Sequence, residues 1–481
     1  MRTRVAFVLT IASACGADYT TPTPDAPATA AVTWYQDAGP IVAKHCMSCH
    51  QTGGIAPFSL TTYDAAAEVA QQMVVQVQAK TMPPFNASEQ SDCTPRFGWK
   101  DDPRLSAQEI QTIADWVSDG AHAGTKVDIP VPSTAGLTGI TQSLTPTVPW
   151  SASGTRDQFI CTILDPQSTG AWLTGLQVRP GNAKVVHHAV ITEVTPSATT
   201  DALVAAHGIG VPFDCSTMQQ PGDIIVDIWT PGNTPLETPS DLAVPVLAGS
   251  KFVLQIHYHP AGTYADPDAT SLDLRMSTAW PRRMYTMAAF GNAVAAPQLL
   301  PDPDDRVAGV PEFRIPANKA DHYEHMTFPI TTLGGLTDVR FYSVNPHQHL
   351  IGTHAQGVIT RAAPTAGQPA TECLANGPWN FDWQRTYVYD APLDSLPSVA
   401  VGDTIDVTCH WNNTISNPFE QRALADASLV APVDVGLGEG QSTDEMCLEI
   451  FGISIPAPAA PLARTTPIAS DLPDLSALVR R

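Results

Sequence analysis

Residues 44–50 read Lys-His-Cys-Met-Ser-Cys-His, so two cysteines separated by two residues are followed directly by a histidine. Two thiols at this spacing add to the two vinyl groups of a haem, and the adjacent histidine is then placed to ligate the iron. The pattern also arises by chance or binds zinc, and the flanking sequence decides against these alternatives. We therefore expect one covalently bound haem at Cys46 and Cys49, with His50 as an axial ligand.

The flanking sequence is helical on both sides of this motif. Residues 34–44 precede it as a helix-forming stretch, and Ser106 and Glu109 form a capping-box pattern that opens an amphipathic segment reaching Val117. Helices at both ends make residues 32–125 resemble a small class I cytochrome c. The resemblance implies a small all-α cytochrome c domain at the start of a multidomain chain.

The second axial ligand should be a soft sulfur or another histidine. Met82 lies in the proline-stiffened stretch 81–85, where cytochromes of this type present their methionine. Met73 is the alternative, but it fits better as a core residue of the preceding helix, and Met47 points away from the iron in the usual geometry of the motif. Two histidines of this domain are expected to face solvent: His45 and His122.

The N-terminus has the pattern of an export signal. Residues 1–15 combine a short basic start, an apolar run and small residues before Cys15. They resemble a bacterial lipoprotein signal peptide with lipid at Cys15, and ordinary cleavage without lipid is the alternative. Residues 16–31, rich in Thr, Pro and Ala, are expected to be a flexible tether. We expect an exported protein of the periplasm or cell surface that contacts the membrane only through this anchor, because no later segment is apolar enough to cross a bilayer.

Charge and cysteine content narrow the class of protein further. The net charge of −22 argues against nucleic acid as a partner, because nothing here would neutralise phosphates. Of nine cysteines, one is assigned to lipid and two to haem. The other six could form three disulfides in an oxidising compartment, and they are Cys93, Cys161, Cys215, Cys373, Cys409 and Cys447.

From about residue 140 to residue 455, short β-prone runs alternate with Gly, Pro, Asp and Asn turns. This alternation is typical of β-sandwiches. We expect two all-β, jelly-roll-like sandwiches at 140–292 and 293–455, followed by a Pro- and Ala-rich tail at 456–481. Six runs support this prediction: 171–178, 185–192, 252–258, 339–344, 357–360 and 404–409.

Histidines gather on three of these runs. The clusters are His187 with His188, His257 with His259, and His347 with His349. Alternation on a strand places two side chains on one face, so His347 and His349 could grip one metal ion. Imidazole suits copper, zinc, iron or nickel, and the ligands alone do not name the metal. Ordinary hydrogen-bonded strand histidines are the alternative, but three clusters in one β-rich chain favour metal binding.

The order of the motifs carries a second resemblance. His-His, Gln-Ile-His-Tyr-His, His-x-His-Leu-x-Gly and Asp-Glu-Met-Cys follow one another between residues 150 and 455. Together they resemble the copper type II, ascorbate-dependent monooxygenases, the family of the peptidylglycine-hydroxylating and dopamine β-hydroxylating enzymes. The resemblance implies one copper in each sandwich, with the two coppers facing each other across a solvent-filled cleft.

The resemblance also assigns ligands. They are His187, His188 and His257 for the electron-transferring copper, and His347, His349 and Met446 for the copper where dioxygen reacts. A thioether beside two imidazoles favours Cu(I), the state that meets dioxygen. His259 would lie behind these ligands or take the place of one of them. Four further histidines are expected to be structural: His322, His325, His354 and His410.

Two disulfides are implied in the same way. They are Cys409–Cys447, which would hold Met446 over its site, and Cys161–Cys215 in the first sandwich. Cys93 and Cys373 are then left, and their pairing across the two modules stays a guess.

The residues that bind substrate in the peptide-amidating branch do not carry over. Asn345 stands where that branch has an arginine, and Ile450 stands where it has a tyrosine. The resemblance therefore implies the copper chemistry without the peptidylglycine specificity.

The sequence as a whole predicts a copper-dependent monooxygenase that hydroxylates a C–H bond of an unknown small-molecule or peptide substrate with dioxygen. The haem would be the electron inlet, fed by a periplasmic donor or an ascorbate-like reductant. A non-catalytic envelope lipoprotein that transfers electrons or handles copper is the alternative. A scaffold that has merely kept the sandwich fold is a third interpretation.

Overall fold

The computed structural model describes residues 31–52, 54, 56–87, 93–131, 136–154, 157–215, 223–258, 266–438 and 443–458. The expected signal peptide with Cys15, the tether up to residue 30, His259 and the tail beyond residue 458 lie outside the described residues. Among the described residues, no helix is both long enough and apolar enough to span a bilayer.

Helices come first in the part of the chain that the structure describes. The first group is η1 (Trp34–Ala38), α1 (Gly39–His45), α2 (Tyr63–Glu68), α3 (Ala70–Gln78) and α4 (Ala107–Ser118), and no strand interrupts it in the described residues. The others are α5 (Ala198–His207), η2 (Phe381–Trp383), η3 (Leu393–Ser395) and α6 (Pro418–Ala427). Helices at 34–44 and 106–117 were predicted and are confirmed. Ser106 and Glu109 form the expected capping box at the start of α4.

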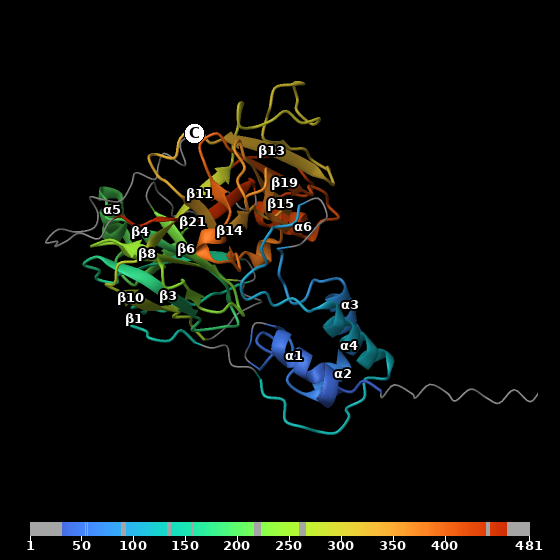
Figure 1. Cartoon of the computed structure of the whole chain (residues 1–481). Coiled ribbons are helices and arrows are strands. Elements are labelled where there is room, and N and C mark those ends of the chain that lie inside the picture. Colours follow the sequence, from blue (N-terminus) through green and yellow to red (C-terminus); the bar gives the residue numbers. More distant parts are fainter. Residues whose placement is uncertain are drawn as a thin grey trace, which may run out of the picture.

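The helical group has a hydrophobic core of its own, separate from that of the sheets. Trp34 of η1 and Trp116 of α4 are its largest members, with ring centroids 5.2 Å apart, so the first and last helices pack directly together. Met73 of α3 lies in this core, as expected, and Met47 is fully buried there. Figure 1 shows these helices as a blue group beside the larger β-rich body.

Strands make up 35% of the chain and helices 16%, which confirms the prediction of a mostly β protein. The six predicted runs all fall on strands. The strands are β1 (Gln142–Leu144), β2 (Gln158–Leu164), β3 (Ala171–Arg179), β4 (Val186–Val194), β5 (Pro212–Asp214), β6 (Ile224–Trp229), β7 (Leu236–Glu237), β8 (Leu242–Val246), β9 (Lys251–Tyr258), β10 (Ser271–Ser277), β11 (Arg283–Gly291), β12 (Arg314–Ile315), β13 (His322–Pro329), β14 (Val339–His347), β15 (Gly352–Thr360), β16 (Thr371–Pro378), β17 (Tyr387–Val388), β18 (Ser398–Val399), β19 (Thr404–Trp411), β20 (Val435–Gly436) and β21 (Leu448–Pro456).

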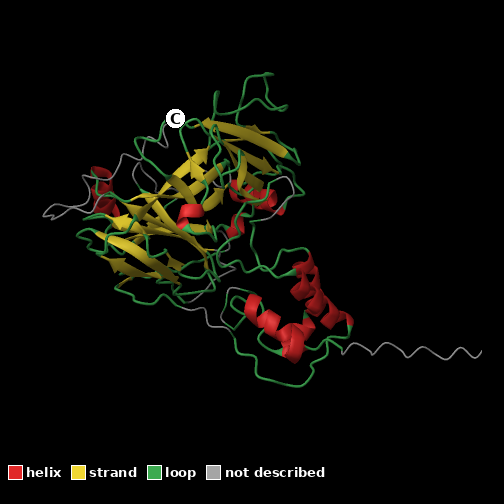
Figure 2. Ribbon diagram, viewed as in Figure 1, coloured by secondary structure: helices red, strands yellow, loops and turns green. Residues whose placement is uncertain are grey.

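Three sheets form most of the β-rich body (Figure 2). The five-stranded sheet has the order β5-β2-β9-β4-β6, and the four-stranded sheet has the order β13-β19-β15-β16. The longest sheet runs β1-β10-β3-β8-β11-β21-β14-β17, with β7 and β18 beside it. Several sheets that share a buried apolar core are compatible with β-sandwich domains.

The longest sheet continues from the first half of the body into the second. β8 and β11 join through a short parallel pairing, Arg283 with Leu242 and Met284 with Ala243. β11 then pairs antiparallel with β21 along its whole length, from the Arg283 end to the Gly291 end. The two halves are therefore held together by backbone hydrogen bonds as well as by side-chain packing.

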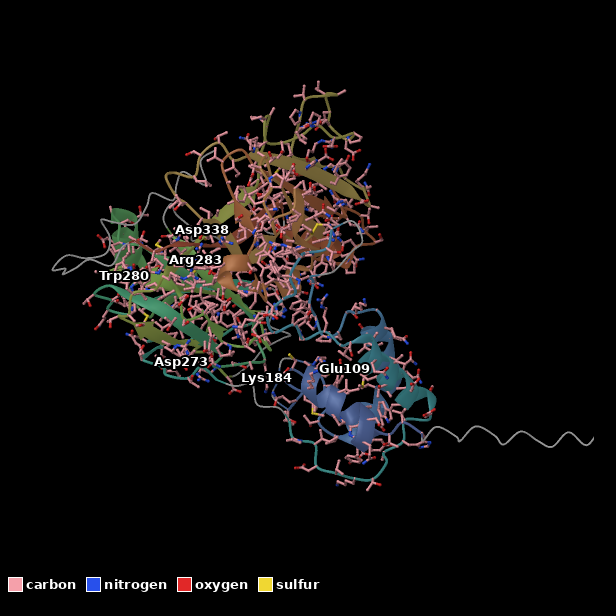
Figure 3. All side chains as sticks on the ribbon, viewed as in Figure 1. Glu109, Lys184, Asp273, Trp280, Arg283 and Asp338 are labelled. Carbon is pink, nitrogen blue, oxygen red and sulfur yellow. A yellow bond between two sulfur atoms is a disulfide. The ribbon has the colours of Figure 1, made fainter. Side chains whose placement is uncertain are left out.

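A buried cation fixes this junction. The guanidinium of Arg283 is almost fully enclosed, and it donates to the side chain and carbonyl of Ser454 on β21 and to Asp338 before β14 (Figure 3). A buried guanidinium is stable only when its donors are satisfied. Arg283 therefore ties three successive strands of the long sheet together.

Three disulfides are present: the two pairs that the resemblance implies are confirmed, and Cys93 pairs with Cys373, which the sequence had left open. They are Cys93–Cys373, Cys161–Cys215 and Cys409–Cys447, with Cα–Cα distances of 5.2, 5.7 and 5.8 Å. The Cys93–Cys373 pair joins the segment before α4 to β16 of the β-rich body. Beside it, the rings of Trp99 and Tyr389 stack with centroids 4.9 Å apart. The helical group is thus attached to the β-rich body covalently and by aromatic packing.

Candidate haem and metal centres

The first histidine cluster lies at the start of β4, in the five-stranded sheet. On a regular strand the adjacent side chains of His187 and His188 would point to opposite faces. The register of β4 against β9 shifts between Val186 and His188, which is a β-bulge. The bulge turns both imidazoles to the same side, and their Nδ1 atoms are 3.4 Å apart.

His257 completes this cluster from the neighbouring strand β9. Its backbone pairs with His188, and its Nδ1 atom lies 3.2 Å from the Nδ1 atom of His188. Ligand atoms of all three histidines lie within 4.8 Å of one another. Burial lowers the pKa of His188 well below its usual value, and the neighbouring histidines lower it further. Neutral imidazoles whose nitrogens converge in this way fit a metal ion that accepts three nitrogen lone pairs.

A carboxylate orients the third imidazole. Asp157 lies 3.3 Å from the Nε2 atom of His257, on the side of the ring opposite Nδ1. Asp157 also forms an ion pair with Arg422 of α6, and Arg422 donates to Asp382 at 2.9 Å. A carboxylate that holds one ring nitrogen of a histidine leaves the other nitrogen free to bind metal. The charges of Asp157, Arg422 and Asp382 therefore brace the first cluster from both halves of the β-rich body.

The second cluster lies at the end of β14, in the long sheet. The rings of His347 and His349 are 5.5 Å apart, so the structure brings the predicted pair together. The expectation that both lie on one strand is wrong, because β14 ends at His347 and His349 follows in the next turn. Gln384 Oε1 lies 3.2 Å from Nδ1 of His347, and the carbonyl of Asp444 lies 2.9 Å from Nδ1 of His349. Both histidines therefore keep Nε2 as the atom that is available to a metal.

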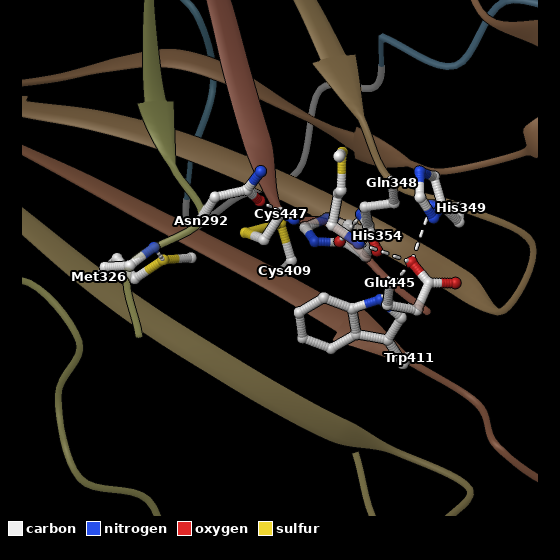
Figure 4. Close-up of a disulfide and its surroundings, with 11 residues drawn as sticks. Asn292, Met326, Gln348, His349, His354, Cys409, Trp411, Glu445 and Cys447 are labelled. Atoms are coloured by element: carbon white, nitrogen blue, oxygen red, sulfur yellow. Dashed lines mark hydrogen bonds between the residues drawn. A yellow bond between two sulfur atoms is a disulfide. The ribbon is translucent and has the colours of Figure 1, made fainter. Parts of the chain in front are cut away.

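Glu445 binds the backbone of both His349 and Met446, and Figure 4 shows its contact with His349. Its Oε2 atom accepts hydrogen bonds from the backbone N–H groups of His349 at 2.7 Å and of Met446 at 3.3 Å, and from the ring of Trp411 at 3.0 Å. The disulfide Cys409–Cys447 closes directly after Met446. The backbone of Met446 is thus fixed beside His349 by one buried carboxylate and one covalent link.

One short segment contacts both clusters. In η2, the ring of Phe381 lies 5.8 Å from that of His257, and the ring of Trp383 lies 5.8 Å from that of His187. The next residue is Gln384, which bonds His347. The two clusters are therefore linked through the side chains of one packed segment.

The haem motif leaves two thiols unpaired. Among the described cysteines, only Cys46 and Cys49 are free. The Nδ1 atom of His50 lies 3.2 Å from the carbonyl of Phe58, so Nδ1–H donates there and Nε2 keeps its lone pair. A cavity of about 390 Å³ opens beside the motif, lined by Ser48 and Gln51 on one side and by Trp229 and Gly232 on the other. Two free thiols and an available imidazole nitrogen fit a covalently attached haem.

Met82 lies in the loop between α3 and α4, as predicted, and is partly buried. Its role as the second axial ligand stays a prediction.

Two other histidines differ in outcome. His45 was expected to face solvent, and this is wrong: it is buried between α1 and α4, with ring nitrogens 2.7 Å from the carbonyl of Pro103 and 3.1 Å from Glu109. His322 was expected to be structural, and its two ring nitrogens lie 3.1 Å from Asp304 and 3.1 Å from Glu324. Although Asp302, His322 and Glu324 are close enough to hold an ion, the ion pairs already account for His322.

Sequence reasoning missed the polar residues that support the ligands. Asp157, Gln384, Glu445 and Arg422 carry no motif of their own. Only the position of Glu445 directly before Met446 was a signal that could have found one of them.

The chain has only weak structural similarity to known proteins. No family model and no curated protein matches the chain. Among solved structures, the major capsid protein P2 of bacteriophage PM2 is 9% identical over 66% of this chain and 99% of that chain, with a TM-score of 0.25. The infectious bursal disease virus VP2 subviral particle is 9% identical over 68% of this chain and 74% of that chain, with a TM-score of 0.16. Likenesses this weak carry no argument about fold or function.

Proposed function

We propose that this chain is a copper-dependent monooxygenase that hydroxylates a C–H bond with dioxygen, and that a c-type haem at Cys46 and Cys49 supplies the electrons. The observation that carries the proposal is the convergence of His187, His188 and His257 beside a second pair, His347 and His349. In the overall reaction one oxygen atom enters the substrate as hydroxyl and the other leaves as water, which consumes two electrons and two protons. Two one-electron sites joined by a shared segment suit that requirement.

Copper bound at these clusters would supply the one-electron redox chemistry. The chain provides neutral imidazoles: burial and, to a smaller extent, the neighbouring His349 lower the pKa of His347 to about 3, so its lone pair is available at neutral pH. Asp157 and Gln384 orient His257 and His347 from behind. The enclosure of the rings keeps bulk water away from the reacting centre.

The cellular setting is part of the proposal. Three disulfides suit an oxidising compartment, and the N-terminal pattern suits export and a lipid anchor at Cys15. A periplasmic reductase or an ascorbate-like reductant is then the electron donor, and the haem receives its electrons first.

Metal analysis and a product screen test this proposal. The purified protein should hold one haem and two copper ions per chain after dialysis. When it is reduced without oxygen and then exposed to isotopically labelled dioxygen with a substrate library, mass spectrometry should detect a labelled hydroxylated product. Reoxidation without any product would favour the electron carrier, and less than one tightly held copper per chain would favour the scaffold.

A matched pair of variants locates the first copper. His257→Ala should lose one copper and keep the haem absorbance. His410→Ala is the control, because His410 is partly exposed and forms an ion pair with Asp321 at 2.9 Å. It should keep both copper ions.

A further inference from the structure

Arg385 is a cation at the meeting point of the three candidate centres. It follows Gln384, the residue that bonds His347. Its guanidinium lies over the ring of Phe85, 4.9 Å from the centroid, and 5.9 Å from the ring centroid of Tyr387. Phe85 ends the stretch that carries Met82. The side chain of Arg385 therefore reaches from the second half of the β-rich body to the loop of the expected haem ligand.

The loop after β6 lies against the haem motif. The Sγ atom of Cys49 is 3.8 Å from the carbonyl oxygen of Pro231 in that loop. Gly232 of the same loop also lies close to Cys49. A Cβ atom added at Gly232 would be 3.2 Å from the Sγ atom of Cys49. That loop lines the 390 Å³ cavity.

A hydrogen bond connects the residue after Arg385 to the strand that leads into the cavity wall. The hydroxyl of Thr386, the next residue, accepts from the backbone N–H of Ile228 at 3.1 Å. Ile228 directly precedes Trp229, which lines the cavity. Arg385 is thus tied to the strand end that faces Cys49.

The guanidinium forms no ion pair with the residues that the structure describes. Its Nε atom is enclosed and has no hydrogen-bond partner among them. Burial lowers the pKa of Arg385, and Tyr387, Asp227, Asp102 and Asp101 act in the opposite direction. An enclosed guanidinium is costly unless a carboxylate pairs with it. Among the residues that the structure describes, no carboxylate pairs with this guanidinium, so the site can accept an anion from outside the chain.

We propose that Arg385 binds a propionate carboxylate of the haem attached at Cys46 and Cys49. A planar guanidinium pairs with a carboxylate through two parallel hydrogen bonds, which would satisfy the enclosed nitrogen. The residue before it bonds His347, so the same pairing would hold the haem edge beside the second candidate copper site. The inference rests on the haem of the proposed function, but not on oxygen chemistry.

Arg104 offers a matched control. It lies over the same Phe85 ring at 5.1 Å, but its guanidinium is already paired with Asp102 and with the carbonyl of Ala87. Both guanidinium groups therefore lie against the Phe85 ring, but only that of Arg104 is paired with a carboxylate.

The full-length holoprotein is tested by redox titration and by resonance Raman spectroscopy of the haem propionates. Arg385→Met should leave a propionate unpaired, which favours the oxidised haem, so its reduction equilibrium should fall about tenfold, or 59 mV for a one-electron couple. Arg385→Lys should retain most of the potential and still shift the propionate band, because a lysine lacks the planar fork. Arg104→Met should leave both the potential and the propionate band close to those of the wild type.

Two outcomes would overturn the inference, and they are distinguishable. If the wild type binds haem and neither Arg385 variant moves the propionate band, Arg385 does not contact the haem. If the wild type lacks haem absorbance altogether, the haem of the proposed function fails and this inference fails with it. Arg385→Lys keeps the charge and length of the side chain, so it serves if Arg385→Met does not fold.

Discussion

The carboxylate of Glu445 accepts a hydrogen bond of 2.7 Å from the backbone N–H of His349, a residue 96 positions earlier in the chain. The same carboxylate accepts from the backbone of Ile351 at 2.8 Å and from the ring of Trp411. Glu445 is almost fully buried, so these donors have no water to replace it. The segment that presents His349 therefore depends on a single side chain that is distant in the sequence.

Replacing Glu445 by Gln should weaken the second copper site. An amide presents N–H to at least one of the buried donors, which should lower the free energy of unfolding by about 1–3 kcal/mol. Loss of a residue that supports a ligand typically weakens metal binding about 10–100-fold. Urea unfolding and copper titration measure the two effects.

Glu193→Gln is the control for this change. Glu193 is also fully buried and accepts from the backbone of Leu247 at 3.2 Å, but it belongs to β4 in the five-stranded sheet. Its variant should lose stability and keep the second copper. If Glu445→Gln folds and holds copper as tightly as the wild type, Glu445 does not position that site.

Met446→Leu should remove the sulfur ligand while conserving side-chain volume. We expect weaker Cu(I) binding at the second site, loss of sulfur scattering in X-ray absorption spectra, and no hydroxylated product. Met326→Leu is the control, because Met326 is a buried methionine on β13 (Figure 4) and should leave both spectra and copper content unchanged. Normal oxygen activation in Met446→Leu would remove Met446 as a ligand.

Asp157→Asn should weaken the first copper site without unfolding the protein. The neutral amide lacks the negative charge that lies 3.3 Å from Nε2 of His257, so copper affinity there should fall about 10–100-fold. Asp382→Asn removes the other partner of Arg422 and should leave the first copper in place. Equal losses in the two variants would mean that Arg422, and not Asp157, is the residue that matters.

The helical group should lose stability in acid through Glu109. Burial opposes the charge of this carboxylate, but hydrogen bonds from Ser106, His45 and Lys44 outweigh it and lower its pKa from 4.5 to about 2. A carboxyl whose pKa is lower in the folded state stabilises the fold above pH 4.5, and this contribution is lost as the pH falls from 4.5 towards 2.

Circular dichroism during acid titration measures this loss. Glu109→Gln should be less stable than the wild type at pH 7, and the difference should shrink as the pH falls towards 2. A difference that stays constant over this range would show that the charge of Glu109 contributes nothing.

Local patterns in the sequence predicted most of the secondary structure. The capping box at Ser106 and Glu109 involves residues three positions apart, and the strand runs alternate with clear turn residues. Two of the three disulfides were also expected, both from the family resemblance, whereas the pairing of Cys93 with Cys373 was left open. These features depend on short-range order or on cysteines, which have few other roles in an oxidised protein.

The geometry around the ligands could not be predicted in the same way. Adjacent histidines do not reveal a β-bulge, and the spacing of His347 and His349 does not reveal that β14 ends between them. Gln384 supports His347 from 37 positions away, and one polar residue at such a distance gives no periodic signal. The buried position of His45 was missed for a similar reason, because Pro103 and Glu109 meet it only after folding.

The link between Cys93 and Cys373 spans 280 residues, and therefore crosses the connection between α4 and β1. A protease that cuts the chain between Ser118 and Gln142 would leave two polypeptides that still migrate as one molecule. Only a reducing agent would then release the helical fragment. Cleavage of that connection in the oxidised protein should consequently leave the helical group tethered to the β-rich body.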